Sequence, residues 1–274
     1  MTETEIRIYK DAEALSADAA EEFIRCAKES IAARGRFAVA LAGGGTPRAL
    51  YSLLASPDKR DRVDWTRTHI FWGDERCVSP TSEDSNYRTA HDALLSKVSM
   101  RPQNIHRIEA ERADVDKAAR DYEIQLQMFF GLTDGDAPHF DLILLGMGRD
   151  GHTASLFPGS DTLEERHRLA VVTWNAGQQM RRITLTLPVL NNARVCLFLV
   201  SGKDKAETLR EVLRPQATDI AATLPAQLVK PKHGRLLWLM DEAAASLLMK
   251  DKELLPRLRQ EMRLSVKKDS NFSA

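Results

Sequence analysis

One histidine lies in a loop from which its imidazole could act on a substrate. His152 belongs to the segment GMGRDGHTA at 146–154, which directly follows Phe140–Leu145, a predicted buried strand. Glycines let a loop approach a ligand closely, and imidazole titrates near neutral pH. His152 is therefore a candidate general base, and Asp150 is placed to orient its ring.

The same loop matches a nucleotide-binding pattern, which we reject. Gly146, Gly148 and Gly151 have the spacing of the dinucleotide fingerprint after a strand. However, Asp150 would face the pyrophosphate with like charge, and Pro158-Gly159 follow too soon for a long helix. No acid ends a strand about 20 residues further on, where the ribose contact belongs. A catalytic loop is the better interpretation.

A glycine triplet after another apolar run has the chemistry of a phosphate-binding loop. It consists of Gly43, Gly44 and Gly45 and follows Phe37–Ala42. Thr46-Pro47 are expected to begin a helix, with Thr46 as its cap. Free backbone amides and a helix N-terminus attract anions. The loop lacks the Lys-Ser or Lys-Thr pair of a P-loop, and a tight turn without a ligand is the alternative.

Charged side chains follow further predicted strands. Asp74, Glu75 and Arg76 come directly after an apolar strand. Arg76 could bind a phosphate with two parallel hydrogen bonds, while Asp74 or Glu75 could orient Arg76 or accept sugar hydroxyls. Lys205 lies at a strand-to-helix turn within reach of a phosphate, and Arg182 opens a strand. Either of these two could instead pair with a surface acid.

The elements that must position these loops alternate between strands and helices. Apolar runs and period-two patterns predict strands at 5–9, 37–42, 68–72, 104–108, 140–145, 169–173, 183–187, 194–200 and 235–240. Apolar residues every three or four positions predict helices at 15–34, from Thr46, and at 85–95, 114–130, 204–213 and 241–249. This alternation predicts an α/β fold with a largely parallel sheet, whose ligands bind beyond the carboxyl ends of the strands.

The composition is that of an ordinary globular protein. Of 274 residues, 43% are hydrophobic and 28% charged, and 39 Lys and Arg balance 39 Asp and Glu. There is no basic excess to indicate nucleic-acid binding, and no apolar run near the ~20 residues of a membrane span. Cys26, Cys77 and Cys196 form no Cys-x-x-Cys pair, and no His-Glu-x-x-His pattern occurs. We therefore expect no disulfide framework, no metal site and no signal peptide.

Several segments together resemble the 6-phosphogluconolactonase family. In chain order they are GGGTP at 43–47, WGDERCV at 72–78, SNY at 85–87, GMGRDGHTASLFPG at 146–159, RITLT at 182–186 and GKDK at 202–205. The segment around Asp-Gly-His is highly specific, whereas the glycine triplet alone is not. The resemblance implies a Rossmann-like three-layer sandwich with a mainly parallel sheet, similar to ribose-5-phosphate isomerase and glucosamine-6-phosphate deaminase.

The resemblance also implies an activity and a set of residue roles. The activity is hydrolysis of 6-phospho-D-glucono-1,5-lactone to 6-phospho-D-gluconate in the oxidative pentose phosphate pathway, in the cytoplasm and without a cofactor. His152 is implied as the general base, with Asp150 as its partner. The implied substrate contacts are Gly43, Gly44, Gly45, Thr46, Asp74, Arg76, Gly148, Arg182 and Lys205. Amides of the 146–151 loop are the expected stabiliser of the oxyanion.

Two other functions fit parts of the pattern. A deaminase-isomerase of the same superfamily would carry Asp-Glu-Tyr where this chain has Asp74-Glu75-Arg76, and Asn-Glu-Pro-Gly where it has LFPG at 156–159. A non-catalytic sugar-phosphate sensor would not need His152 and would usually carry a DNA-binding domain. We expect one domain over 1–274, with a C-terminal helix and tail from about residue 250.

Overall fold

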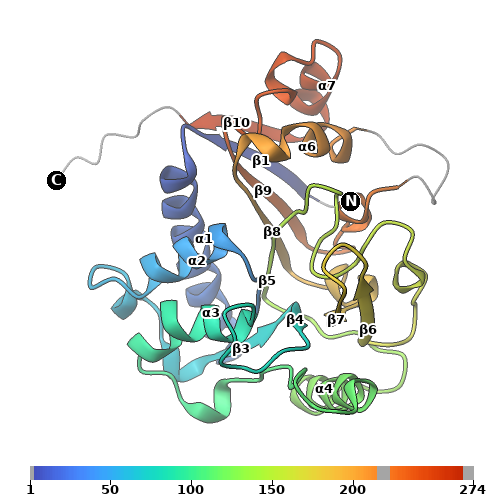
Figure 1. The fold of residues 1–274 in the computed structure, drawn as a ribbon. Coiled ribbons are helices and arrows are strands. Elements are labelled where there is room, and N and C mark those ends of the chain that lie inside the picture. The colour runs from blue at the N-terminus through green and yellow to red at the C-terminus, as the bar shows by residue number, and fades with distance from the viewer. Residues whose placement is uncertain (1–2, 215–222, 268–274) are drawn as a thin grey trace.

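A seven-stranded parallel sheet forms the centre of the computed structural model, which describes residues 3–214 and 223–267 (Figure 1). The strands run in the order β10-β1-β9-β8-β5-β2-β3, and every neighbouring pair is parallel. Their bounds are Glu3–Tyr9 (β1), Phe37–Leu41 (β2), Thr68–Trp72 (β3), Leu142–Leu145 (β5), Val195–Val200 (β8), Arg235–Asp241 (β9) and Arg263–Lys267 (β10). The predicted α/β fold with a mainly parallel sheet is confirmed.

Helices cover the sheet and explain the composition of its central strands. Every residue of β2, β5 and β8 is buried, as expected for strands covered on both faces. The helices are α1 (Ala12–Arg34), α2 (Gly45–Leu54), α3 (Asn86–Ala93), α4 (Val115–Phe130), α5 (Leu187–Leu190), α6 (Ala206–Val212) and α7 (Leu254–Glu261). The first three pack side by side, at the left of Figure 1. None of the described helices is long and apolar enough to cross a membrane.

A small antiparallel sheet, which the sequence did not predict as a unit, lies beside the large one. It consists of β4 (Asp74–Arg76), β7 (Met180–Leu185) and β6 (Ala170–Asn175), with β7 in the middle. Its register places Arg76 directly opposite Arg182. Residues that directly oppose each other in an antiparallel pair lie on the same face. The small sheet therefore places the side chains of Arg76 and Arg182, which come from distant parts of the chain, on one face.

The C-terminal region differs from the predicted helix and tail. A helix, α7, is present, but it is followed by β10, which pairs in parallel with β1 at the edge of the sheet. The sequence RLSVK of β10 has little apolar content, and its burial pattern is that of a partly exposed edge strand. Residues 268–274 of the predicted tail lie outside the described residues.

Three local predictions were wrong for reasons visible in the hydrogen bonding. No strand covers 104–108, because a 3-10 turn occupies Pro102–Asn104 and only Ile105 bridges to β3. No α-helix covers 241–249, because the Asp241 carboxylate caps only a series of hydrogen-bonded turns, through the amide of Ala244, and these turns do not continue as an α-helix. The helix after the glycine triplet begins at Gly45 with Gly44 as its N-cap, so Thr46 is not the cap.

A histidine pair is packed into an aromatic cluster next to β3. The ring of His106 stacks on Phe71, with centroids 4.2 Å apart, and its Nε2 lies 3.2 Å from Nδ1 of His69. Burial and then the neighbouring His69 lower the pKa of His106 to about 4. Since an unfolded histidine titrates near 6.5, the folded state favours neutral His106 at a pH where the unfolded chain binds a proton.

We therefore expect the free energy of unfolding to fall as the pH drops from about 6.5 towards 4, and this contribution to be complete above that range. His106 should account for about 1–2 kcal/mol of this loss in the free energy of unfolding. That is less than its pKa shift alone would give, because the side chain is only half-buried. Urea titrations of wild type and His106→Phe at about pH 7 and pH 4.5 measure it. The variant keeps an aromatic ring against Phe71 but cannot titrate, and an acid-induced loss as large as that of wild type would contradict the prediction.

Candidate active site

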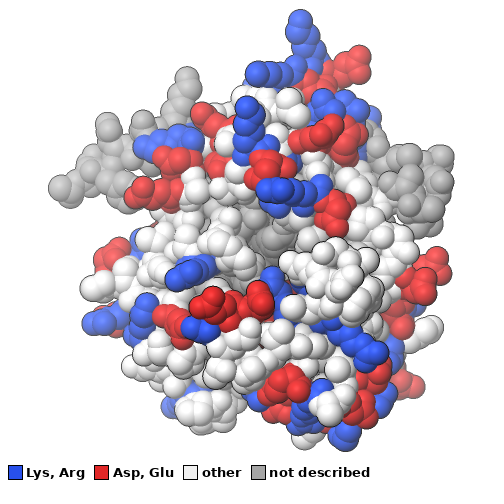
Figure 2. Space-filling view, viewed as in Figure 1, with Lys and Arg blue, Asp and Glu red and all other residues white. Residues whose placement is uncertain are grey.

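The carboxyl ends of four adjacent strands, β3, β2, β5 and β8, surround an open cleft of about 210 Å³. A hollow flanked by charged side chains is visible near the centre of the face shown in Figure 2. The cleft brings together most of the side chains singled out in the sequence: Gly43, Gly44, Asp74, Arg76, Gly148, His152, Arg182 and Lys205. Gly45, Thr46 and Asp150 are not among the residues lining it, although Asp150 contacts His152 directly.

His152 and Asp150 form a hydrogen-bonded pair at the edge of the cleft. Nδ1 of His152 lies 2.5 Å from Oδ1 of Asp150, which also accepts from the backbone amide of His152. Burial opposes ionisation of Asp150, but the hydrogen bonds and charge of His152 outweigh it and lower the pKa of this carboxyl. An ionised Asp150 keeps the proton of neutral His152 on Nδ1, which leaves Nε2 free to accept one. The pair can therefore act as an oriented general base.

Gly148 provides the space in which this pair lies. A Cβ atom at residue 148 would lie 2.1 Å from Nδ1 of His152 and 2.5 Å from Oδ1 of Asp150. Both distances are far below contact distance, so these two side chains would have to move. The same atom at Gly146, in the same loop, would meet nothing within 4 Å.

Gly148→Ala should accordingly reduce kcat about 10- to 100-fold with little loss of stability, because it displaces the pair by roughly 1 Å without obstructing the backbone. Steady-state kinetics together with a thermal melt measure both effects. Gly146→Ala adds the same methyl group to the same loop and should retain more activity. Equal activity of the two variants would show that the position of the pair is not critical.

A buried cluster centred on Asp74 connects the loop after β5 to the small sheet. Asp74, which is 5% exposed, accepts from Oγ of Ser155 at 2.6 Å and from Nδ2 of Asn86 at 3.2 Å. Nη1 of Arg182 lies 3.7 Å from Oδ2 of Asp74 and donates to Oγ of Ser155 at 3.2 Å. Asn86 also lies so close to the glycine loop that a Cβ at Gly43 would be 1.8 Å from its Oδ1. This cluster fixes three loops relative to one another.

Glu75 has a structural role rather than the substrate contact considered from the sequence. Its carboxylate is 3% exposed and accepts from the backbone amides of Arg76, Asn86 and Tyr87, each at 2.8 Å. Burial raises the pKa of Glu75, and these hydrogen bonds act in the opposite direction. The side chain thereby anchors the N-terminus of α3 beside β4. Of the two acids, Asp74 is the one that lines the cleft.

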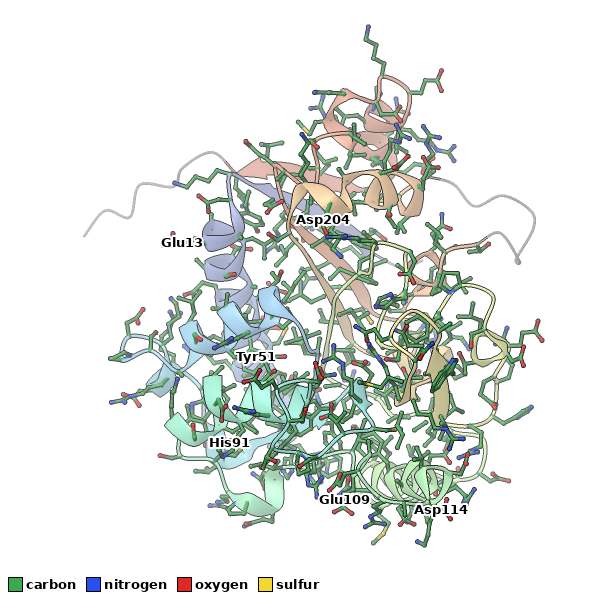
Figure 3. The ribbon with its side chains drawn as sticks, viewed as in Figure 1. Glu13, Tyr51, His91, Glu109, Asp114 and Asp204 are labelled. Atoms are coloured by element: carbon green, nitrogen blue, oxygen red, sulfur yellow. The ribbon has the colours of Figure 1, made fainter. Side chains whose placement is uncertain are left out.

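The loop that carries Lys205 is held by a buried acid and by the loop after β5. Asp241, at the end of β9, accepts from Oγ of Ser201 at 2.5 Å and from the amide of Gly202 at 3.1 Å. Asp204, labelled in Figure 3, pairs with Arg149 of the loop after β5 at 2.8 Å. Nζ of Lys205 is 3.8 Å from Asp204 and lines the cleft. Because that carboxylate is already bound by Arg149, Lys205 remains available to an anionic ligand.

Tyr51 of α2, also labelled in Figure 3, holds the start of the glycine loop. Its hydroxyl donates to the carbonyl of Ala42 at 2.7 Å and accepts from the amide of Ala42 at 3.0 Å. The side chain is fully buried. These two hydrogen bonds fix the direction in which the chain enters the loop, so that Gly43 and Gly44 line the cleft.

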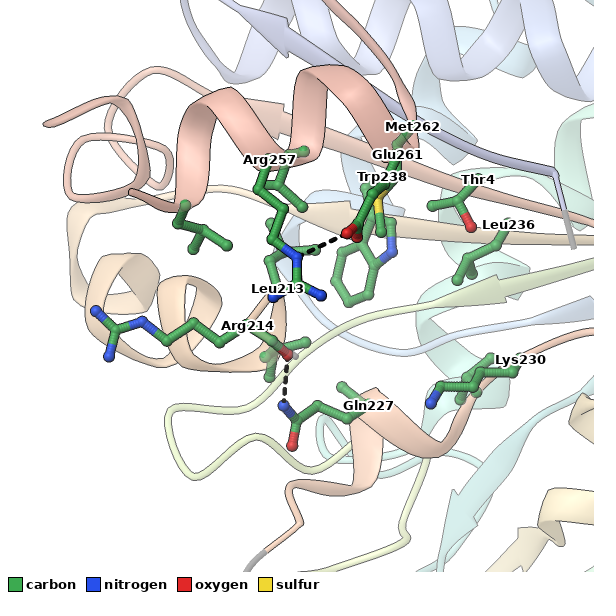
Figure 4. Close-up of a pocket in the computed structure, with 15 residues that line it drawn as sticks. Thr4, Leu213, Arg214, Gln227, Lys230, Leu236, Trp238, Arg257, Glu261 and Met262 are labelled. Atoms are coloured by element: carbon green, nitrogen blue, oxygen red, sulfur yellow. Dashed lines mark hydrogen bonds and ion pairs between the residues drawn. The ribbon is translucent and has the colours of Figure 1, made fainter. Parts of the chain in front are cut away.

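Another cavity, of about 260 Å³, lies between β9, α6 and α7 (Figure 4). Its walls include Leu213 and Trp238, and its polar groups are paired with one another: Arg257 with Glu261 at 2.7 Å, and Gln227 with the carbonyl of Arg214. The described residues around it include no histidine or cysteine. The smaller cleft is therefore the better candidate for catalysis.

An open parallel sheet with a histidine–aspartate pair and convergent basic side chains at its carboxyl edge defines a class of protein, the α/β enzymes that act on small anionic substrates. A model of the family described as Glucosamine-6-phosphate isomerases/6-phosphogluconolactonase matches residues 10–238. The chain belongs to this family.

Individual relatives agree with this assignment. A 6-phosphogluconolactonase of Synechocystis sp. is 44% identical over 216 residues, which cover 79% of this chain and 86% of that protein. The structure of 6-phosphogluconolactonase from Trypanosoma brucei superposes with a TM-score of 0.78 and 26% identity, covering 90% of this chain and all of that one. A monomeric glucosamine-6-phosphate deaminase, 24% identical with a TM-score of 0.72 over 89% of this chain and 99% of that one, shares the fold.

Proposed function

We propose that this protein is a 6-phosphogluconolactonase, which hydrolyses 6-phospho-D-glucono-1,5-lactone to 6-phospho-D-gluconate in the oxidative pentose phosphate pathway. The observation that carries the proposal is the convergence of the His152–Asp150 pair with Arg76, Arg182 and Lys205 on one cleft. The named relatives support the same reaction. We also propose that residues 1–274 form one domain and that the enzyme lies in the cytoplasm.

The chemistry requires a base but no covalent nucleophile, because a δ-lactone is an activated ester. Nε2 of His152 takes a proton from a water molecule, and the water oxygen attacks C1 of the lactone. Cys77, the cysteine next to Arg76 in the sequence, is unsuited to nucleophilic attack, because burial raises its pKa to about 11. The activated water is therefore the nucleophile, and no metal ion is assigned a role.

The phosphate gives the enzyme a distant point by which to orient the lactone. Charge-assisted hydrogen bonds contribute about 1.5–3 kcal/mol each, and orientation of the reacting groups lowers the barrier further. We assign this contact to Lys205, Arg76 and the amides of Gly43 and Gly44. Thr46 lies in the first turn of α2 and does not line the cleft. It could therefore contact the phosphate only from behind the residues that do.

Turnover by the purified protein tests the proposed function. Freshly prepared 6-phosphoglucono-1,5-lactone is added, and acid release above the spontaneous rate is followed with EDTA present. We expect rapid formation of 6-phosphogluconate and no ammonia from glucosamine 6-phosphate. The reverse result would favour the deaminase-isomerase. Binding of sugar phosphates without any turnover would favour a sensor.

A further inference from the structure

We propose that Arg182 is a catalytic residue that stabilises the oxyanion formed at C1 of the lactone, rather than a further contact to the phosphate. This inference rests on the proposed function. It assigns to one side chain the oxyanion stabilisation expected from the amides of the 146–151 loop. It also divides the basic residues of the cleft into two functional groups.

The guanidinium of Arg182 is held rigidly, as oxyanion stabilisation requires. The residue is 4% exposed and lies on β7, in the middle of the small sheet. Its Nη1 donates to Ser155 at 3.2 Å, its Nη2 donates to Gln178, and Asp74 lies 3.7 Å away. Donors already fixed in place need no reorganisation when negative charge develops, which makes them effective in a transition state.

One donor of this fixed group has no acceptor. Nε of Arg182 is buried and makes no hydrogen bond to any described residue. A buried donor without a partner costs about 1–3 kcal/mol. Arg182 lines the cleft, and its guanidinium carries five N–H donors, of which Ser155 and Gln178 occupy only two, so donors remain for an oxygen atom of a bound substrate. Burial lowers the pKa of Arg182, with Asp74 acting in the opposite direction, but arginine remains charged in proteins.

Arg182 lies beside the catalytic base. The ring of Phe157 has its centroid 4.9 Å from that of His152 and 5.7 Å from Cζ of Arg182. The imidazole and the guanidinium thus share one aromatic neighbour. Lys205, in contrast, reaches the cleft from the loop that follows β8. The base and Arg182 therefore belong to the part of the cleft where the carbonyl must lie.

The charges of the two arginines separate their roles further. Asp74 balances Arg182, whereas Arg76 has no carboxylate partner among residues 3–214 and 223–267 and donates instead to the carbonyl of Asp84. A phosphate dianion is bound best by uncompensated charge, which Arg76 supplies. A charge-balanced donor attracts the ground state weakly and gains most when a new negative charge forms.

Hydrolysis passes through a tetrahedral intermediate. The water oxygen bonds to C1 as its proton passes to Nε2 of His152, and the C=O π electrons move to the carbonyl oxygen, which Arg182 stabilises. The C=O bond then re-forms and the bond from C1 to the ring oxygen breaks. The ring oxygen takes the proton from His152 and becomes the C5 hydroxyl. The carboxylic acid finally loses its proton to solvent.

The test compares Arg182→Gln and Arg182→Lys on the phosphorylated lactone and on unphosphorylated glucono-1,5-lactone. Arg182→Gln should lower kcat about 10²–10³-fold on both substrates, the usual effect of removing one oxyanion donor, with KM changed little. Arg182→Lys keeps the positive charge and should recover part of the loss. The matched control is Arg181→Gln, since Arg181 is exposed and its side chain lies on the opposite face of β7.

Each outcome is decisive when wild type is active and the variants melt as wild type does. A loss on both lactones at unchanged KM supports oxyanion stabilisation. A loss confined to the phosphorylated lactone, mainly in KM, would assign Arg182 to the phosphate and overturn the inference. Unchanged kinetics of Arg182→Gln would overturn it as well. Absence of wild-type turnover would instead contradict the proposed function itself.

Discussion

Replacing His152 with alanine is expected to lower kcat about 10²–10⁴-fold, on the phosphorylated lactone and on glucono-1,5-lactone alike. The substitution removes Nε2, the atom that the hydrogen bond to Asp150 leaves free to accept a proton. The water must be activated whichever lactone is bound, so the loss should not depend on the phosphate. Stopped-flow or pH-stat assays must subtract spontaneous hydrolysis, which sets the lowest measurable rate.

The chain contains a second histidine–aspartate pair that serves as a control. Nδ1 of His91 lies 3.1 Å from Oδ1 of Asp92, but both side chains are exposed and neither lines the cleft. Figure 3 labels His91 on α3. His91→Ala should therefore leave the kinetics as in wild type. Activity of His152→Ala within a few-fold of wild type would rule out its role as the base.

Replacing Lys205 or Arg76 with alanine should weaken use of the phosphorylated lactone selectively. Each charge-assisted contact to phosphate contributes about 1.5–3 kcal/mol, which corresponds to a 10- to 150-fold loss in kcat/KM. Glucono-1,5-lactone lacks the phosphate, so wild type should already use it poorly and the variants should be little worse. The ratio of kcat/KM for the two lactones is the quantity to measure, because misfolding would lower both values together.

Lys203→Ala is the matched control for Lys205→Ala. Lys203 lies in the same turn, but it is exposed and does not line the cleft. Its removal should leave the ratio unchanged. If the Lys205 and Arg76 variants remained folded and lost the same factor on both lactones, the phosphate contact would be wrongly assigned. Both side chains would then act on the lactone ring or on the structure of the cleft.

The central strands could be predicted because each is a continuous run of apolar residues. β2, β5 and β8 are covered on both faces and therefore consist of continuous apolar runs. The strands β4 and β10 gave no such signal. β4 has only three residues, all charged, and β10 is a partly exposed edge strand. Both form because a distant partner strand offers backbone hydrogen bonds, which no local pattern reveals.

In the candidate site, too, residues with a local sequence pattern could be predicted, whereas contacts between distant segments could not. His152, Asp150 and the glycine loops could be found because each follows a buried strand, and parallel strands direct their carboxyl ends to one edge. The positions of Ser155 and Gln178 around Arg182 had no local signal, since they depend on the register of the small sheet. The Ser155–Asp74 bond joins residues 81 positions apart, and it becomes visible only in the folded chain.

In a crystal structure of the wild-type protein with 6-phosphogluconate bound, we expect the product to lie in the cleft, with its phosphate about 3 Å from Nζ of Lys205 and from the amides of the glycine loop. The C1 carboxylate should lie against Nε2 of His152 and the guanidinium of Arg182. A product bound outside this cleft, or bound inside it with the carboxylate at Lys205 and the phosphate at His152, would contradict the account.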